Sequence, residues 1–309
     1  MKIIGDPHLG REFKQNVPLD RRGEREALMF KQFTDELNVP DDLIIVIGDL
    51  FEHWYISYEN LYRTIEILLS WQKRFPKKVL VLLQGNHDYS PANGVYGAWD
   101  ILDLSLRPYA NIRVVRKPET ICGVVFFPWE WDRSAEEQLN DITLWTSTAV
   151  GHWDLVDYGG DTGHLCPAGS LKAHGVTRIV SGHWHLAGVY TIDGVDVECT
   201  GSMQPMTHAE DPEGKMYVTL TSEEYARTDP ETLRDKYVRV RGPNVSDITP
   251  PETCLGFKTE RVDRGTVVPT EKVTLGDFDI KKILDKHLKA HEVPEDVQRE
   301  VKERLSAVT

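Results

Sequence analysis

Short apolar runs recur along the first two thirds of the chain, and most of them end in a cluster of polar residues. The run Val79-Leu80-Val81-Leu82-Leu83 has no polar alternation, so we expect a strand that is buried on both faces. Residues 188–192 and 195–200 flank Asp193-Gly194, a pattern that predicts a β-hairpin. The predicted strands are 2–4, 43–47, 79–83, 112–115, 121–127, 148–150, 178–181, 188–192, 195–200 and 216–220.

Amphipathic stretches alternate with these runs. Phe30, Phe33 and Leu37 recur at helical spacing and predict a helix at about 20–37. Further helices are expected at about 58–75, 96–106 and 134–146. The order strand-helix-strand-helix-strand predicts a sheet that is wrapped by helices through crossover connections. We expect 112–115 and 121–127 to belong to a second sheet.

Composition narrows the class of protein. The 309 residues, 40% of them hydrophobic, can form one large domain with a smaller appendage. The chain begins directly in a predicted strand and has no run of 18 apolar residues, so we expect no signal peptide, no membrane span and a soluble cytoplasmic protein. Four cysteines without a CxxC pair favour reduced thiols over disulfides or a zinc knuckle.

The net charge of −13 argues against a surface that attracts nucleic acid everywhere. A phosphate-bearing substrate remains compatible with this charge, because bound divalent cations would reverse the local field in a carboxylate-rich cleft.

Residues of the kind that bind metals follow five of the predicted strands. In an open α/β sheet, ligands bind at the carboxyl ends of strands. The donors are oxygen and nitrogen without a thiolate, which suits Mn, Fe or Zn rather than a structural zinc site. Seven ligands are too many for one ion, so we expect two ions roughly 3.5–4 Å apart that share a carboxylate. The seven are Asp6, His8, Asp49, Asn86, His152, His183 and His185, with His87 and Asp88 beside them.

These motifs resemble those of the calcineurin-like metallophosphoesterases over roughly residues 1–220. They are Asp6-x-His8, Gly48-Asp49, Gly85-Asn86-His87-Asp88, Gly151-His152 and Gly182-His183-x-His185. The resemblance implies a four-layered α/β/β/α sandwich with two divalent metal ions. One ion would be held by Asp6, His8, Asp49 and His185, and the other by Asp49, Asn86, His152 and His183, with Asp49 bridging. His87 would protonate the leaving oxygen or stabilise charge on the phosphoryl group, and Asp88 would position His87.

Finer features are similar to the SbcD-type DNA repair nucleases. They are Asp6-Pro7-His8-Leu9-Gly10, Gly48-Asp49-Leu50-Phe51 and Thr200-Gly201-Ser202. We therefore expect a phosphoesterase domain at 1–220 and a C-terminal α+β region at 221–309, with strands near 236–240 and 257–262 and helices near 280–291 and 294–305. By this resemblance the C-terminal region caps the nuclease and its helices bind an SbcC-like coiled-coil ATPase. A compact cap that packs only on its own core is the alternative.

The loop after the second motif departs from that family pattern. The family usually carries a histidine directly after Gly-Asp-Leu-Phe, whereas this chain has Glu52 there and His53 one residue later. Either His53 substitutes or the exonuclease activity is altered, and we favour substitution. Trp129 and Trp131 could stack unpaired bases, although packing at the sheet rim is the plainer interpretation.

The function that these features favour is a metal-dependent DNA exonuclease or endonuclease, the nuclease subunit of an SbcCD-like repair and recombination complex. We expect Mn²⁺, with Mg²⁺, Fe²⁺ or Zn²⁺ as alternatives. DNA, the ATPase subunit and a second copy of the chain are the expected partners. A small-molecule (cyclic nucleotide) phosphodiesterase is the first alternative. A protein phosphatase is disfavoured because no Gly-Asp-x-x-Asp-Arg-Gly pattern follows Gly48, and a non-enzymatic scaffold is disfavoured by the full ligand set.

Overall fold

Four parallel strands form the first sheet, in the order β1-β2-β3-β4. The computed structural model describes residues 1–90, 95–156 and 163–262. Side chains of β2 and the residue after it alternate: Ile44 and Val46 pack against the helices, and Ile45 and Ile47 face the second sheet. Both faces are therefore apolar, as expected from the uninterrupted run. The elements are β1 (Lys2–Ile4), α1 (Glu24–Leu37), β2 (Leu43–Val46), α2 (Tyr58–Arg74), β3 (Val79–Leu83), α3 (Ala98–Leu106) and β4 (Ile112–Val115).

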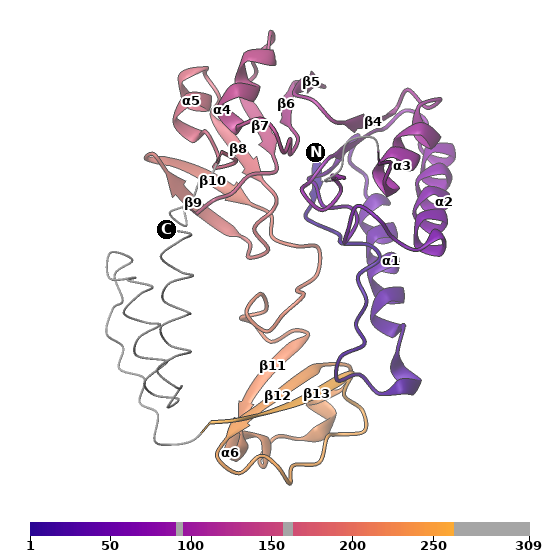
Figure 1. Cartoon of the computed structure of the whole chain (residues 1–309), viewed down its shortest axis with the longest axis vertical. Helices are drawn as coiled ribbons and strands as arrows, with labels where there is room; N and C mark the ends of the chain where they lie inside the picture. The colour runs from indigo at the N-terminus through magenta and orange to yellow at the C-terminus, as the bar shows by residue number, and fades with distance from the viewer. Residues whose placement is uncertain (91–94, 157–162, 263–309) are drawn as a thin grey trace, which may run out of the picture. The chain divides into compact units, whose positions relative to one another are not determined.

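The second sheet is mixed and has the order β5-β6-β7-β8-β10-β9. Phe126 and Val150 face the first sheet, whereas Val125 and Phe127 belong to the core beneath the second helical layer. Figure 1 shows α2 and α3 outside the first sheet and α4 and α5 beside the second. The predicted α/β/β/α sandwich is confirmed. Its elements here are β5 (Glu119–Ile121), β6 (Val124–Phe127), α4 (Ala135–Gln138), β7 (Thr148–Gly151), α5 (Ala168–Ala173), β8 (Arg178–Ser181), β9 (Gly188–Ile192) and β10 (Val195–Cys199).

A third, parallel sheet has the order β11-β12-β13. Val238 and Val240 on β12 are buried with Leu233 in a small apolar core of their own. The opposite face carries polar residues, because side chains alternate along a strand. The elements are β11 (Tyr217–Thr221), α6 (Ser222–Tyr225), β12 (Tyr237–Gly242) and β13 (Gly256–Arg261), with 3₁₀ turns at Leu19–Arg21, Leu139–Asp141 and Pro230–Leu233.

Buried Arg25 of α1 joins this sheet to the rest of the unit. Its Nη2 donates to the carbonyl of Pro205 at 2.9 Å, and its Nη1 lies 2.7 Å from the Met216 sulfur. Residues Met1–Arg261 form one compact unit. The expected division at residue 220 stays a prediction, and the helices expected at 280–291 and 294–305 lie outside the described residues.

Several predicted elements need correction. Residues 112–115 form β4 of the first sheet, not a strand of the second. The helix expected at 134–146 is only α4 followed by one 3₁₀ turn, and α5 was not predicted. The strand expected at 216–220 forms as β11 and pairs with β12 in the third sheet.

Two expectations from composition can be compared with the structure. All four cysteines are free, and Cys122 alone among them is exposed. Within the described ranges, none of the helices is both long and apolar enough to cross a membrane.

Candidate metal centre

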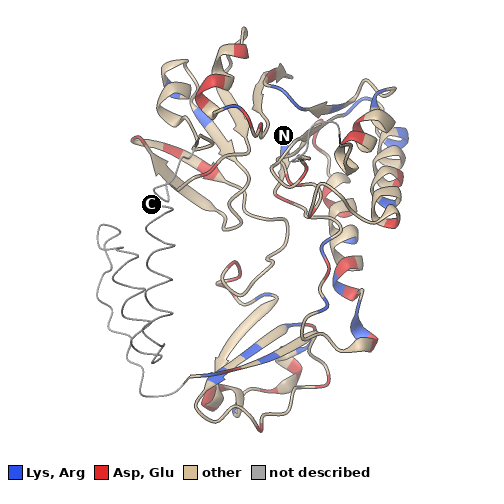
Figure 2. Cartoon of the chain, in the orientation of Figure 1, with Lys and Arg blue, Asp and Glu red and all other residues tan. Residues whose placement is uncertain are grey.

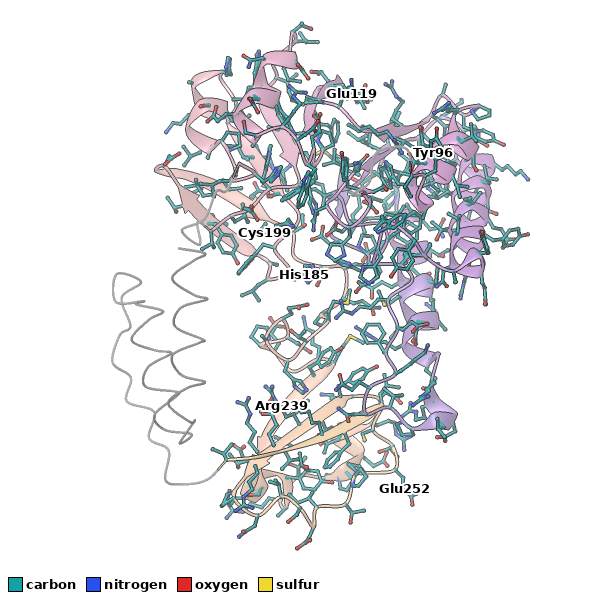
Figure 3. The ribbon with its side chains drawn as sticks, in the orientation of Figure 1. Tyr96, Glu119, His185, Cys199, Arg239 and Glu252 are labelled. Atoms are coloured by element: carbon teal, nitrogen blue, oxygen red, sulfur yellow. The ribbon has the colours of Figure 1, made fainter. Side chains whose placement is uncertain are left out.

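The structure brings all seven predicted ligands to one edge of the two facing sheets. They lie on the loops that follow β1, β2, β3, β7 and β8, whose carboxyl ends meet there. Figure 3 labels His185, which lies on the loop after β8. Asp6, His8, Asp49 and His152 are almost fully buried, at 0–1% exposure, which is costly for polar groups without partners.

Asn86 is the centre of one group of ligand atoms. Its Oδ1 lies 3.0 Å from His152 Nε2 and 2.9 Å from His183 Nδ1. His152 Nε2 in turn lies 3.4 Å from Asp49 Oδ2. Asp49, His152 and His183 thus have ligand atoms within 4.8 Å of one another, a spacing that one cation can span.

His8 and His185 form a second group beside Asp49. Their Nε2 atoms face each other at 3.0 Å, and His8 Nε2 lies 3.8 Å from Asp49 Oδ2. Two nitrogens at right angles around one ion, each about 2.1 Å from it, would lie about 3.0 Å apart. Glu52 and His87 also have ligand atoms within 4.8 Å of His8.

The buried carboxylates need positive charge. Both Asp6 oxygens are buried without a hydrogen-bond partner among the described residues, and burial raises the pKa of the Asp6 carboxyl. Burial opposes ionisation of Asp49 as well, but the neighbouring His152, His8 and His87 rings lower its pKa. Unpartnered carboxylate oxygens among imidazole nitrogens fit divalent cations, so the residues present suit the metal ions that the resemblance implies.

Each of the four histidines has an oxygen acceptor close to its outer ring nitrogen. His152 Nδ1 donates to the carbonyl of Ile47 at 3.0 Å, which turns Nε2 toward the centre. Such outer acceptors orient metal-binding histidines and raise their basicity. Sequence reasoning missed Asp154 and Glu210 and did not give Glu52 this role. The other three contacts are His8 Nδ1 to Glu52 Oε2 at 3.0 Å, His183 Nε2 to Asp154 Oδ1 at 2.9 Å and His185 Nδ1 to Glu210 Oε2 at 3.4 Å.

Two glycines allow these close approaches. A Cβ on Gly48, whose φ is +120°, would lie 2.1 Å from His152 Nδ1. A Cβ on Gly85 would lie 2.2 Å from Asp49 Oδ1. His8 and Asp49 themselves have positive φ values of 46°, a conformation that side chains other than glycine adopt at a cost of roughly 1–3 kcal/mol. His183 also has a positive φ, of 72°, so three of the predicted ligands carry this backbone strain.

Asp88 does not hold the His87 ring, so this expectation is wrong. Its carboxylate accepts hydrogen bonds from the backbone N–H groups of Gly85 at 3.0 Å, Phe51 at 3.0 Å and Leu50 at 3.3 Å. Burial and nearby Asp49 raise the pKa of Asp88 to about 8, although these N–H groups act in the opposite direction. Asp88 instead ties the loop after β3 to the loop after β2.

Replacing Asp88 with alanine should therefore destabilise the fold. Three buried N–H groups would lose their acceptor, and we expect a loss of about 3–5 kcal/mol in the free energy of unfolding. Urea denaturation measures it. Asp88→Asn, which keeps one acceptor oxygen, should lose less, and equal stability of Asp88→Ala and wild type would contradict this role.

Glu52 turns inward, whereas His53 is exposed. Glu52 Oε1 also accepts from Arg11 Nη1 at 3.1 Å. Burial opposes its ionisation, but the His8 ring and Arg11 hold the pKa of the Glu52 carboxyl below its usual range. The departure from the family pattern thus places a carboxylate oxygen 3.0 Å from His8 Nδ1.

Glu52→Ala should weaken metal binding about 10–100-fold, because His8 would lose the group that orients it. Glu52→Gln should weaken binding less, since an amide oxygen can still accept. Titration of the metal-free protein with Mn²⁺ measures this. Glu12→Ala is the matched control, because Glu12 forms an exposed ion pair with Lys14. Unchanged affinity in Glu52→Ala would exclude this role.

His53, Trp129 and Trp131, the three residues expected to bind substrate, lie in different environments in the structure. The His53 ring stacks beside His87, with ring centroids 5.9 Å apart. Trp129 is only 7% exposed and its ring stacks on His164 at 3.8 Å, so packing explains it better than base stacking. Trp131 is 69% exposed.

Two facing sheets lie between helical layers, and carboxylate, amide and imidazole side chains gather at the ends of their strands. This combination of fold and site is that of a metal-dependent phosphoesterase. The sequence matches the family model of calcineurin-like phosphoesterases over residues 2–187, and the chain belongs to this family. Members typically use two divalent metal ions to hydrolyse phosphoesters. A comparison with curated protein sequences found no match.

Proposed function

We propose that the chain is a two-metal phosphodiesterase that hydrolyses DNA, as the nuclease subunit of an SbcCD-like repair and recombination complex. The observation that carries the two-metal part is the position of Asp49. One of its oxygens lies 3.8 Å from His8 Nε2 and 3.4 Å from His152 Nε2, between the two groups of ligands. A shared carboxylate at this point suits a pair of ions.

In this proposal each ion has four donors, and Asp49 is common to both sets. Asp6, His8, Asp49 and His185 would hold one ion, and Asp49, Asn86, His152 and His183 would hold the other. Mn²⁺ is the proposed metal, because the donors are mixed oxygen and nitrogen without a thiolate. When bound, the ions would stabilise the charge that develops on the phosphoryl oxygens.

His87 is proposed to protonate the leaving oxygen. The Glu52 carbonyl can only accept, so His87 Nδ1 carries the proton of their hydrogen bond. The other ring nitrogen, Nε2, then remains to exchange a proton with the substrate. The backbone N–H of His87 donates to Asp49 Oδ1 at 2.9 Å, which keeps the ring next to the ligand groups.

The motif resemblance supports the proposals of a DNA substrate and an ATPase partner. The exposed His53 adds support for the DNA substrate. Its ring continues the surface of His87 outward to Tyr55, whose ring centroid lies 5.9 Å from that of His53. Such a surface could contact a nucleotide next to the scissile bond.

The test is hydrolysis with added Mn²⁺ of linear double-stranded DNA, single-stranded DNA and a chromogenic phosphodiester. Degradation of DNA that is absent from Asp49→Asn would support the nuclease. Cleavage of the small diester alone, also after addition of the candidate ATPase, would replace this proposal with a small-molecule phosphodiesterase.

A further inference from the structure

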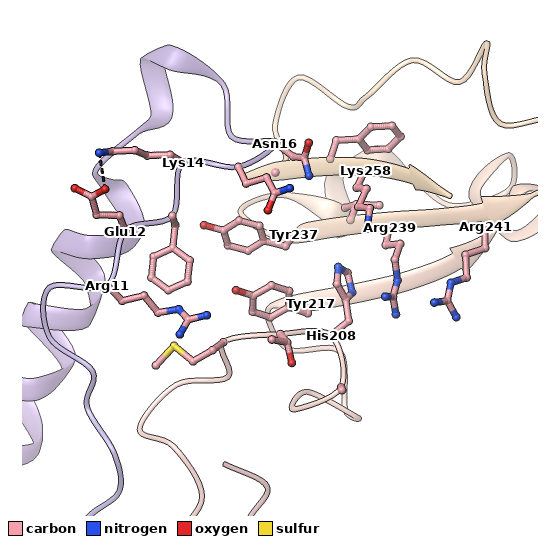
Figure 4. Close-up of a pocket in the computed structure, with 18 residues that line it drawn as sticks. Arg11, Glu12, Lys14, Asn16, His208, Tyr217, Tyr237, Arg239, Arg241 and Lys258 are labelled. Atoms are coloured by element: carbon pink, nitrogen blue, oxygen red, sulfur yellow. Dashed lines mark hydrogen bonds and ion pairs between the residues drawn. The ribbon is translucent and has the colours of Figure 1, made fainter. Parts of the chain in front are cut away.

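A cavity of about 600 Å³ lies on the polar face of the third sheet, and it is not part of the metal centre. Its walls come from the segment after the first motif, residues 11–16, from the loop 206–209 and from β11–β13. Figure 4 shows the stacked rings of Tyr217 and Tyr237 between these walls. The volume suits a ligand the size of a mononucleotide, since small-molecule sites usually measure about 300–1,000 Å³.

Positive charge dominates the lining although the whole chain carries −13. The lining includes five Lys or Arg residues, Arg11, Lys14, Arg239, Arg241 and Lys258, and a single acid, Glu12. Lys14 is paired with Glu12, and Arg11 with Glu52. The other three cations stand together on β12 and β13, where Figure 2 shows basic positions on the third sheet.

Strand register explains this cluster. Thr219, Arg239 and Lys258 are partners across the three strands, and Thr221, Arg241 and Glu260 are partners two positions later. All six therefore share one face.

Glu260 is the sole carboxylate of that row and contacts all three cations. Its oxygens accept from Arg241 Nε at 2.7 Å and from Lys258 Nζ at 2.9 Å, and lie 3.7 Å from Arg239 Nη1. Hydrogen bonds from Lys258 and Arg241 lower the pKa of Glu260 to about 2. Three positive charges against one negative charge leave an excess of two, and Arg241 keeps its terminal nitrogens without a hydrogen-bond partner among the described residues.

His208 lies beside these cations. Its ring lies against Tyr217 with centroids 5.1 Å apart, and its Nδ1 is 3.1 Å from Thr219 Oγ1. Burial, then Arg239, lower the pKa of His208 to about 4, and Arg241 and Lys258 act in the same direction. The imidazole is therefore neutral at pH 7, beside a region that disfavours further positive charge.

The deeper part of the cavity offers aromatic and amide groups. Tyr237 stacks on Tyr217 at a centroid distance of 4.8 Å, and Phe13 lies 6.2 Å from Tyr237. The Tyr237 hydroxyl is buried without a hydrogen-bond partner in the described part of the chain. Asn16 also lines the cavity and can both donate and accept.

We propose that this cavity is a nucleotide-binding site, separate from the metal centre. The phosphate binds to Arg239, Arg241 and Lys258, because guanidinium and ammonium groups bind phosphate through charge-assisted hydrogen bonds. The nucleoside lies toward the tyrosine pair and Asn16. The nucleotide is either a free mononucleotide or the terminal nucleotide of a strand, since both present the same phosphate and base. The site does not require that the metal centre hydrolyse DNA.

Calorimetric titration of the full chain tests the proposal, in EDTA so that phosphate cannot bind through metal ions. The ligands are 2′-deoxyadenosine 5′-monophosphate, inorganic phosphate, deoxyadenosine and a 5′-phosphorylated oligonucleotide. We expect the mononucleotide to bind at one site, and to bind more tightly than phosphate or the nucleoside alone. Tighter binding of the oligonucleotide would identify a strand end as the source, and tighter binding of the mononucleotide would identify the free nucleotide.

Two variants should move the affinity in opposite directions. Arg241→Gln with Lys258→Gln should weaken mononucleotide binding about tenfold or more, because charge-assisted hydrogen bonds are lost. Glu260→Gln should tighten binding, because it removes the carboxylate that competes with phosphate. Arg178→Gln is the matched control: Arg178 also pairs with a carboxylate on a neighbouring strand, Glu198, but it is outside the cavity lining. Absence of mononucleotide binding, or affinities unchanged in both variants, would overturn the site, whether or not the chain is a nuclease.

Discussion

Asp49→Asn should lose metal-dependent phosphoester hydrolysis almost completely, by about 10³-fold or more. The Asp49 carboxylate lies between the two groups of ligands, 3.8 Å from His8 Nε2 and 3.4 Å from His152 Nε2. Asparagine removes the negative charge at that point and leaves a single oxygen. Neither group of ligands would then share a carboxylate with the other, and bound metal should fall with activity.

Misfolding is a weak explanation for such a loss. Asp49 has a φ of 46°, and asparagine tolerates this left-handed conformation better than most residues. The amide oxygen can also keep the hydrogen bond that Asp49 Oδ1 accepts from His87 N at 2.9 Å. Thermal unfolding of the metal-free variant should therefore remain cooperative, although the variant loses the stabilisation that the histidine rings give to the ionised Asp49.

The measurements are hydrolysis of a chromogenic phosphodiester and elemental analysis of bound metal. Asp211→Asn is the matched control, because Asp211 is buried and accepts three backbone N–H groups but lies outside the ligand groups. The control should lose stability while keeping activity per folded molecule. Wild-type activity or full metal content in Asp49→Asn would contradict the shared carboxylate.

The strand ends could be predicted because the signal is local. An uninterrupted run such as 79–83 can only be buried on both faces, and the ligands follow it directly in sequence. The position of β4 could not be predicted in this way, because an apolar run does not reveal which strand it pairs with. The short length of α4 has a similar cause: the Ser134–Glu137 capping box that begins it is local, but the end of the helix depends on packing.

The acceptors behind the histidines could not be predicted, because they join loops that are distant in sequence. Glu210 lies 25 residues after His185 and reaches it only in the fold. Asp154 is only two residues after His152, yet it holds His183 from another loop. For Asp88 the partner suggested by the sequence is wrong. His87 is its neighbour in sequence, but the Asp88 carboxylate accepts hydrogen bonds from backbone N–H groups of the loop after β2.

His87→Ala should lower kcat by about 10²–10⁴-fold while leaving the bound metal unchanged. The reason is the position of the two ring nitrogens. Nδ1 donates to the Glu52 carbonyl, so the ring is oriented with Nε2 available to exchange a proton with the leaving oxygen. Alanine removes this proton donor, while the His87 backbone N–H that contacts Asp49 remains.

Metal analysis is essential in this experiment, because His87 has a ring nitrogen within 4.8 Å of ligand atoms of His8 and Glu52. Metal loss in parallel with activity would make His87 a ligand rather than a proton donor, and retained activity would exclude both roles. His174→Ala is the matched control, since that ring stacks on Trp145 at 4.0 Å, outside the ligand groups. A leaving group with a low pKa needs little protonation, so the loss in His87→Ala should be smaller for a nitrophenyl diester than for DNA. An equal loss with both substrates would indicate that His87 stabilises phosphoryl charge instead.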